Sequence, residues 1–323
     1  MREFYINGNE KGQRFDKYLK KLLSGAPNGF LYKMLRKKNI VLNGKRADGT
    51  EKLCAGDHVK LFLSDETFEK FSGADAAQSE FSRLRDLRPQ VPLKVIFEDA
   101  DVIVIDKPAG MLSQKAVPSD ISANEYILHT LIARGELTEE TLRTFRPSVC
   151  NRLDRNTSGL LIAGKTLKGL QETSEALKSR SIQKYYRCLV KGEVKECSHI
   201  DGWLAKDVQT NRVTVLPEAA ENAVRIETEY RPVRTENGYS ELEVHLITGR
   251  SHQIRAHLAS VGHPILGDFK YGDSILNRRL KQKLQVDSQM LHAYRIVFAD
   301  GREITAPCGE EFERVWRYFV ALM

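Results

Sequence analysis

The sequence has little cysteine, no long apolar run and no glycine-rich phosphate loop, and each absence excludes a class of protein. Its five cysteines are scattered without a C-x-x-C pair, which argues against a disulfide framework and a cysteine zinc site. No apolar stretch approaches the length of a membrane span, and the first residues lack the apolar core of a secretory signal. We therefore expect a cytoplasmic protein without membrane association, and nothing supports a nucleotide-driven activity.

The eight histidines give no metal-binding pattern either. Four of them lie close together in the sequence: His245, His252, His257 and His263. The H-E-x-x-H spacing that brings two imidazoles to one face of a helix is absent. We therefore expect no metal site.

Positive charge is concentrated at one end of the chain. The net charge is +7, and residues 1–50 contain twelve Lys or Arg against four Asp or Glu, so this segment alone carries +8. The other 273 residues are nearly neutral, with 38 basic and 39 acidic groups. Because a phosphate backbone attracts a local excess of positive charge, the N-terminal part is predicted to bind nucleic acid.

The basic segment is predicted to fold as two short amphipathic helices and a small hairpin. Apolar residues recur at helical spacing over residues 15–23 and again over 30–35, with lysines and arginines at the other positions. The turn signal Asn43-Gly44 follows. Over about residues 13–63 this arrangement resembles the αL RNA-binding domain named after a ribosomal small-subunit protein. The resemblance implies that six cations face RNA phosphates, namely Lys33, Arg36, Lys37, Lys38, Lys45 and Arg46.

The length of 323 residues favours two domains. We predict the RNA-binding domain at residues 1–64 and a larger domain at 91–323. Residues 65–90 are predicted to form a linker, because this polar stretch shows neither helical nor strand periodicity. The larger domain is rich in strands, and hairpin signals at Asn237-Gly238 and Asp300-Gly301 imply antiparallel pairing. The predicted fold class is α+β, with a mostly antiparallel mixed sheet and flanking helices.

Chemically loaded residues gather in three segments where a strand meets a turn or a helix. These are I-D-K-P-A-G-M at residues 105–111, N-R-L-D-R-N-T-S-G at 151–159 and T-G-R-S-H-Q-I-R-A-H at 248–257. In the third segment, Ser251 is a suitable cap for a helix. His252 and Arg255 share a helix face that is separate from the apolar stripe, so Arg255 is free to meet a partner.

Together these segments resemble the RluA-type pseudouridine synthases. The family patterns D-K-P-x-G, R-L-D-x-x-T-S-G and T-G-R-x-H-Q-I-R are present, as are G-H-P-I-L-G-D at residues 262–268 and Y-G at 271–272. The resemblance covers about residues 91–323. It implies an enzyme that flips a uridine out of structured RNA and isomerises it to pseudouridine with one carboxylate, without a metal or a cofactor.

The resemblance also implies roles for individual residues. Asp154 would be the catalytic aspartate, Arg255 its ion-pair partner, and Tyr186 the ring that stacks on the uracil. Arg152 would help to hold the target nucleotide out of the stack, and further substrate contacts would come from Arg250, His252 and Gln253. An ionised aspartate can either attack the anomeric carbon or remove a sugar proton, and the sequence leaves both routes open.

Two positions depart from the family pattern. Asn151 and Gln114 stand where the family usually has a histidine before R-L-D and another after the D-K-P-x-G turn. Both amides still form hydrogen bonds, and neither is expected to take part in bond breaking. We therefore expect activity to be kept, with altered contacts near the site.

The favoured partner is large-subunit ribosomal RNA. Proteins that join these two kinds of domain mostly act on it, and residues 31–37 resemble the RluC/RluD branch of the family. Transfer RNA is an alternative substrate. A non-catalytic RNA-binding factor in ribosome assembly is the alternative from another class, although Asp154, Tyr186 and Arg255 argue against it. We expect a monomer.

Overall fold

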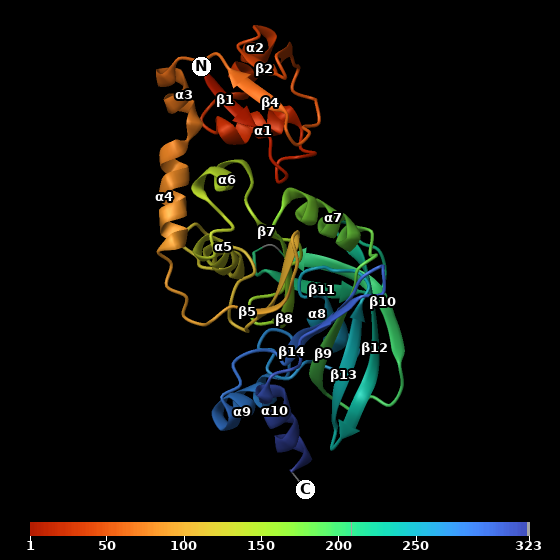
Figure 1. Cartoon of the computed structure of the whole chain (residues 1–323). Coiled ribbons are helices and arrows are strands. Elements are labelled where there is room, and N and C mark those ends of the chain that lie inside the picture. Colours follow the sequence, from red (N-terminus) through yellow and green to blue (C-terminus); the bar gives the residue numbers. More distant parts are fainter. Residues whose placement is uncertain (208, 322–323) are drawn as a thin grey trace.

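A small N-terminal unit, a helical connection and a larger sheet-based unit make up the computed structural model, which describes residues 1–207 and 209–321 (Figure 1). The N-terminal elements are β1 (Arg2–Tyr5), α1 (Phe15–Leu22), α2 (Asn28–Arg36), β2 (Ile40–Leu42), β3 (Lys45–Arg46) and β4 (His58–Leu61). The four strands pair antiparallel in the order β1-β4-β2-β3. Two short helices therefore pack with a small antiparallel sheet, as the sequence predicted.

Local sequence explains the N-terminal unit. Helix α1 buries Phe15, Tyr18, Leu19 and Leu22, which share one face at helical spacing, while its lysines lie on other faces. The turn between β2 and β3 has positive φ at both Asn43 and Gly44, which is the conformation that an Asn-Gly hairpin turn requires.

The connecting segment is helical, although its sequence shows neither periodicity. It contains α3 (Asp65–Ser72) and α4 (Ala74–Arg85). Each helix buries few apolar residues, since α3 places Phe68 in the N-terminal core and α4 places Leu84 in the larger core. With so few buried apolar residues in each helix, the sequence shows no helical periodicity. Gly73 joins the two helices at φ 59, where a Cβ would overlap with the Ser24 hydroxyl.

The larger unit is built on a long mixed sheet. Its strands are β5 (Lys94–Glu98), β6 (Val102–Lys107), β7 (Ser148–Val149), β8 (Ser158–Gly164), β9 (Gln183–Lys191), β10 (Ser198–Asp207), β11 (Arg212–Leu216), β12 (Val224–Glu236), β13 (Tyr239–Leu246), β14 (Leu291–Val297) and β15 (Glu303–Thr305). Nine of them follow the order β11-β10-β12-β13-β9-β14-β8-β6-β5, while β15 pairs with β14 and β7 with β8. Only the β14–β8 pair is parallel among the described strands. The α+β fold class is confirmed.

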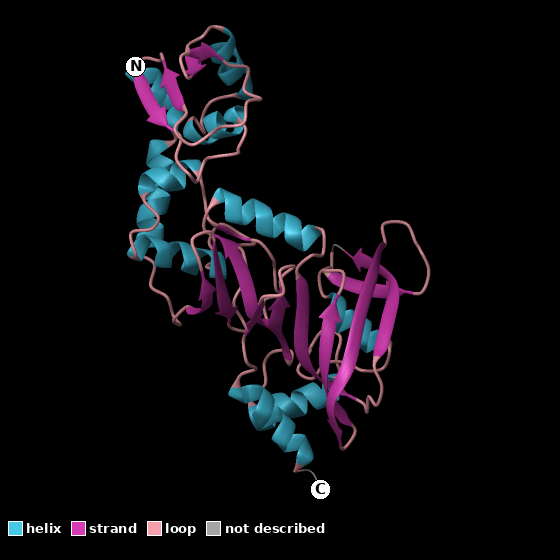
Figure 2. Cartoon of the chain, turned by 45° about the vertical axis from the view of Figure 1, so that its right-hand side comes forward, coloured by secondary structure: helices cyan, strands magenta, loops and turns pink. Residues whose placement is uncertain are grey.

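Helices cover parts of both faces of this sheet. They are α5 (Ala123–Ala133), α6 (Glu139–Thr144), α7 (Leu167–Lys178), α8 (Gln253–Ser260), α9 (Ser274–Leu284) and α10 (Glu310–Val320). Successive residues of a strand face opposite sides, so Leu161 of β8 packs with α5 and α8, whereas Ile162 packs with α7. Helices α9 and α10 lie at the end farthest from the N-terminal unit (Figures 1 and 2).

Within residues 1–207 and 209–321, no helix is both long and apolar enough to cross a bilayer.

Candidate active site

Asp154 lies in the loop between β7 and β8, with 23% of its side chain exposed. Two side chains pin this loop from other segments. The Ser113 hydroxyl accepts from the Leu153 amide and donates to the Leu153 carbonyl, both at 2.9 Å. The Gln289 amide donates to the Thr157 hydroxyl at 3.0 Å. The carboxylate therefore sits on a loop whose backbone is fixed on both sides of it.

Lys107 fixes the same loop by hydrogen bonds to backbone carbonyls. Its ammonium group donates to the carbonyl oxygens of Pro108, Met111 and Arg155 at 2.8–3.0 Å, and the side chain is completely buried. Burial lowers the pKa of Lys107 to about 7, although the charge of Asp154 favours the protonated form. The lysine of the D-K-P-A-G turn thus ties that turn to the backbone next to Asp154.

Gly159, the last residue of the R-L-D-x-x-T-S-G pattern, is required by a close backbone approach. It has φ 109, and a Cβ there would overlap with the backbone of Ala293 in β14. The approach allows β8 to pair in parallel with β14 directly after the Asp154 loop.

Arg255 of α8 joins Asp154 to a second carboxylate. Its Nη1 donates to Asp154 Oδ2 at 2.8 Å, while Nε and Nη2 donate to the two oxygens of Asp268 at 2.7 and 2.9 Å. Burial opposes the charged guanidinium, but the hydrogen bonds and charges of Asp268 and Asp154 outweigh it and raise the pKa of Arg255. One arginine therefore presents a single remaining nitrogen to Asp154.

Asp268 itself is fully buried. Its Oδ1 also accepts from the backbone amides of Lys270 and Tyr271 at 2.9 and 3.1 Å. Burial alone would raise the pKa of Asp268, but the Arg255 guanidinium and these amides lower it below its usual value. The buried carboxylate is thus ionised and compensated.

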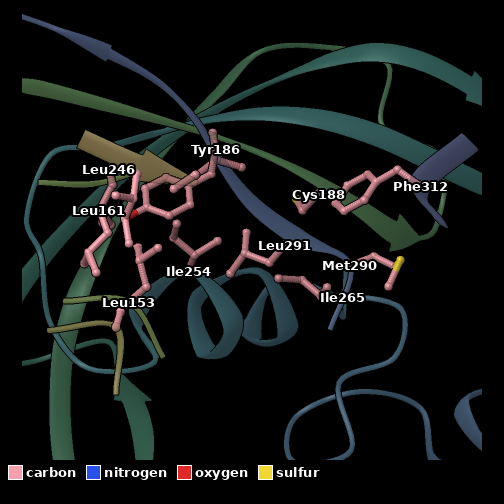
Figure 3. Close-up of a cluster of buried hydrophobic side chains, with 14 of the residues drawn as sticks. Leu153, Leu161, Tyr186, Cys188, Leu246, Ile254, Ile265, Met290, Leu291 and Phe312 are labelled. Atoms are coloured by element: carbon pink, nitrogen blue, oxygen red, sulfur yellow. The ribbon is translucent and has the colours of Figure 1, made fainter. Parts of the chain in front are cut away.

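Tyr186 lies on β9 among Leu153, Leu161, Leu246 and Ile254, with its ring in the apolar cluster beside the Asp154 loop (Figure 3). Only 5% of it is exposed. Burial, with the nearby charge of Asp154, raises the pKa of its hydroxyl above the usual range. The ring is close to the carboxylate, but side chains that now cover it must move before a base can stack on its face.

The loop before α8 differs from the sequence expectation. The helix begins at Gln253, and the residue that caps it is His252 in a left-handed conformation with φ 56, in place of the expected Ser251. His252 Nδ1 lies 2.9 Å from the Tyr271 hydroxyl. A non-glycine residue in this conformation is held by its surroundings.

Gln253 is buried, and its amide group is used within the protein. The side-chain oxygen accepts from the Thr248 hydroxyl at 2.9 Å and from the Arg250 amide at 3.1 Å, and the nitrogen donates to the Glu227 carbonyl at 2.9 Å. This argues against the direct substrate contact that the resemblance implied. Gln253 anchors the start of α8 to β12 and thereby helps to place Arg255.

Arg152 and Arg250, in contrast, are both exposed. Within the part of the chain that the structure describes, neither forms an ion pair with an acidic side chain. Both guanidinium groups are therefore available to an anionic ligand.

The two departures from the family pattern have different surroundings. The Asn151 side chain accepts from the Ile162 amide at 2.8 Å and donates to the Leu160 carbonyl at 3.3 Å, so it hydrogen-bonds with β8 as a neighbouring strand would. Gln114 is exposed. The side chain at position 151 therefore both donates and accepts a hydrogen bond, which the Asn151 amide can do.

The six predicted RNA-binding cations lie on α2, on β3 and directly after α2. All six are exposed, and among the described residues none of the six has an acidic partner. They gather on one small unit. Across residues 1–207 and 209–321, no three His, Cys, Asp or Glu side chains are placed to hold a metal ion.

Sequence reasoning assigned no role to several residues of this site, namely Lys107, Ser113, Asp268 and Tyr271. Three of them stand inside the family patterns, so the patterns marked their positions without giving their contacts. Asp268 reaches Arg255 across 13 residues, and Lys107 reaches the Arg155 carbonyl across 48. Such contacts depend on how the segments pack.

Comparison with known proteins places this site in a family. The model of the RNA pseudouridylate synthase family matches residues 101–260, which include Asp154, Tyr186 and Arg255. The ribosomal large subunit pseudouridine synthase C of Vibrio vulnificus is 30% identical over 96% of this chain and 94% of its own length. The protein of that name from Escherichia coli K12 is 29% identical, over 96% and 93%.

The chain therefore belongs to the RluA-type RNA pseudouridine synthases and is an isomerase. Within the family it is similar to synthase C over nearly its whole length. Among solved structures, human RNA pseudouridylate synthase domain containing 4 has a TM-score of 0.57 at 17% identity, covering 77% of this chain and 97% of that one. This likeness supports the fold.

Proposed function

We propose that the protein isomerises uridines in large-subunit ribosomal RNA. The observation that carries this substrate is the extent of the match, because the relatives named for the ribosomal large subunit align with 96% of the chain. The alignment thus includes the basic N-terminal segment as well as the Asp154 site. Transfer RNA is the second candidate substrate and is separated by the experiment below.

We further propose that residues 1–64 form the RNA-binding domain and residues 91–323 the catalytic domain, joined by 65–90. Two separate hydrophobic clusters support this division, one built from the N-terminal elements and the other from the large sheet and its helices. The exposed cations of the first domain would bind phosphates without reading sequence. They would raise the affinity for RNA, and the second domain would select the uridine.

Several cations of the catalytic domain that lie near the Asp154 site have no acidic partner within the described part of the chain. On the back of the sheet, arginines are paired with acids, as in Arg187 with Glu241, and Arg231 with Glu243. Around the site, five cations have no acidic partner among the described residues, namely Arg152, Arg155, Arg212, Arg250 and Lys270. Arg212 and Lys270 donate to backbone carbonyls, but without an acidic partner in the described structure the charge of each of the five can still be neutralised by phosphate groups.

The target nucleotide must leave its stack before Asp154 can reach it, at a cost of a few kcal/mol. Arg152 would stabilise the flipped nucleotide from the exposed side of the loop. Tyr186 would stack on the uracil once the covering side chains have moved. The buried ring supplies an apolar wall that excludes water from the reacting bond.

In the proposed chemistry, Asp154 acts as an ionised carboxylate. The bond between the anomeric carbon and uracil N1 breaks with its electrons going to the base, after attack by Asp154 on that carbon or removal of a sugar proton. The detached uracil turns and its C5 bonds to the anomeric carbon, as the Asp154 ester bond breaks on the first route or Asp154 returns the proton to the sugar on the second. C5 then loses its proton and N1 gains one, so the product is an isomer of the substrate. Because no water is added, a second carboxylate of the kind that glycoside hydrolysis needs is not required.

The test is to restore deletion cells with the wild-type protein, Asp154→Asn or Asp154→Ala, and to map pseudouridine in ribosomal and transfer RNA. We expect pseudouridine to be lost from specific sites of large-subunit RNA in both variants. Unchanged modification at every site would refute the catalytic role of Asp154. Loss confined to transfer RNA would refute the ribosomal substrate and keep the mechanism.

A further inference from the structure

A chain of hydrogen bonds runs from the β10–β11 hairpin to the N-terminus of α8. The Val213 amide in β11 donates to the Tyr271 hydroxyl at 2.9 Å, and this hydroxyl lies 2.9 Å from His252 Nδ1. The Tyr271 ring meets the His252 ring edge-on, with 5.6 Å between the centroids, and it lies 5.2 Å below the Arg255 guanidinium. Tyr271 therefore contacts both His252 and Arg255, the ion-pair partner of Asp154.

The hydrogen-bond partners of the Tyr271 hydroxyl favour one tautomer of His252. A backbone amide only donates, so the Tyr271 oxygen accepts from Val213, and the tyrosine proton is left to be donated. His252 Nδ1 is the only other group within hydrogen-bond distance of this hydroxyl among the described residues. Burial raises the pKa of Tyr271, so the hydroxyl keeps its proton at neutral pH. With Nδ1 as the acceptor of that proton, the proton of the neutral ring resides on Nε2.

Several charged groups surround His252, and their effects oppose one another. Burial lowers the pKa of His252 first, and the cations Arg255 and Lys270 lower it further. The carboxylates Asp154 and Asp268 favour the protonated ring. The result is a pKa below the usual value for histidine, so the ring is neutral at physiological pH.

We infer that Tyr271 and His252 form a positioning pair, in which the tyrosine hydroxyl fixes His252 as the Nε2–H tautomer and leaves that N–H to donate to the target nucleotide. No described residue accepts from Nε2, so this N–H is available to the substrate. A neutral donor suits an uncharged oxygen of the flipped nucleotide, which is either a ribose hydroxyl or a uracil carbonyl. This inference rests on the proposed role of Asp154.

The arrangement also explains why a neutral residue is held here. A protonated imidazole would be a second cation close to Asp154 and would compete with Arg255 for the carboxylate that has to react. The left-handed backbone of His252 supports the same reading, because a non-glycine residue keeps this conformation only where the surroundings enforce it. Tyr271, whose hydroxyl and ring contact the His252 side chain, is part of those surroundings.

The first test measures the tautomer without any RNA. Long-range proton–nitrogen NMR spectra of protein labelled with ¹⁵N-histidine distinguish a protonated ring nitrogen from an unprotonated one, and comparison with His252→Asn assigns the signals. We expect the proton on Nε2 in the wild type and a mixture of tautomers in Tyr271→Phe. A proton on Nδ1, or the same pattern in Tyr271→Phe, would overturn the inference whatever the RNA substrate is.

The second test is the pH profile of the single-turnover rate. We expect Tyr271→Phe to move the acid limb of the profile upward by about one pH unit, the value of one hydrogen bond. His252→Asn keeps a neutral donor and tolerates the left-handed backbone, so it should lose this titration and retain more activity than His252→Ala. Tyr318→Phe, which removes a hydroxyl with no hydrogen-bond partner in the described structure, should match the wild type.

The last comparison identifies the oxygen that accepts from His252. The effect of His252→Ala is measured with uridine and with 2′-deoxyuridine at the target position of the RNA. An effect confined to uridine assigns the donor to the 2′-hydroxyl, and an equal effect on both assigns it to the base or to another ribose oxygen. An acid limb that is identical in the wild type, Tyr271→Phe and His252→Asn would overturn the positioning role, even with Asp154 confirmed as catalytic.

Discussion

Asp268 holds Arg255 by two parallel hydrogen bonds, of 2.7 and 2.9 Å, and so decides which nitrogen of the guanidinium meets Asp154. Arg255 is 8% exposed and Asp268 is fully buried. The Arg255 side chain cannot rotate away from Asp268 without leaving the buried Asp268 carboxylate without a compensating positive charge. The orientation of Arg255 is therefore set before any RNA binds.

Asp268→Asn should slow the reaction without weakening RNA binding. The amide has one acceptor oxygen where the carboxylate has two, so Arg255 loses one of its two hydrogen bonds to residue 268 and its orientation toward Asp154 becomes less fixed. We expect the single-turnover rate to fall by about 10- to 100-fold, the usual effect of changing a residue that orients a catalytic group. Asp287→Asn, at a largely exposed carboxylate, is the matched control. A change in the Kd for RNA larger than the change in rate would contradict this reading.

Arg255→Lys should slow the reaction strongly even though the substitution keeps the positive charge. A lysine has no fork and cannot bind both oxygens of Asp268 while also reaching Asp154. We expect the rate to fall by about 100-fold or more, whereas RNA affinity should stay near that of the wild type. Rate and affinity are measured separately, by single-turnover kinetics and filter binding. Wild-type rates in the variant would show that charge alone is sufficient.

Lys107 should make stability depend on pH above neutrality. Its pKa is lowered to about 7 in the folded protein, below the value of an unfolded lysine. Between these two pKa values the unfolded chain binds more protons, so the free energy of unfolding should rise with pH by about 1.4 kcal/mol per unit. Below pH 7 the contribution should be flat, because the lysine is protonated in both states.

Urea unfolding of the wild type and Lys107→Met at several pH values between 6 and 10 isolates this effect, since the other titrating groups are shared. The methionine variant should lack the rise. Parallel curves for the two proteins would show that Lys107 keeps its ordinary pKa when folded.

Cations at and directly after the end of α2 should contribute affinity without specificity. Replacing Lys37 by Ala should weaken binding to all RNA sequences to a similar degree and reduce the salt slope of binding by about one. The rate at saturating RNA should not change, because the residue lies outside the catalytic domain. Lys178→Ala on α7, an exposed lysine beside Glu175, serves as the control. A sequence-dependent loss at Lys37 would indicate that this domain also reads bases.

The sequence by itself determined the features that depend on near neighbours. Asn43-Gly44, Asn237-Gly238 and Asp300-Gly301 each lie at the turn of an antiparallel hairpin, since a tight turn needs the φ values that those residues supply. The same local reading found the amphipathic helices and the segregation of charge. It failed for α3 and α4, because each has too few buried residues to show a period.

Only the tertiary structure decided the contacts that the marked residues make. The family resemblance implied that Asp154 and Arg255 pair, and sheet register together with the packing of α8 brings these two residues, 101 apart in the sequence, to 2.8 Å. The structure also shows that the Gln253 side chain hydrogen-bonds to the Glu227 carbonyl of β12 and that the Asn151 side chain hydrogen-bonds to the backbone of β8. Which atoms face one another depends on contacts between segments that are distant in the sequence. The residues directly before and after a position do not reveal these contacts.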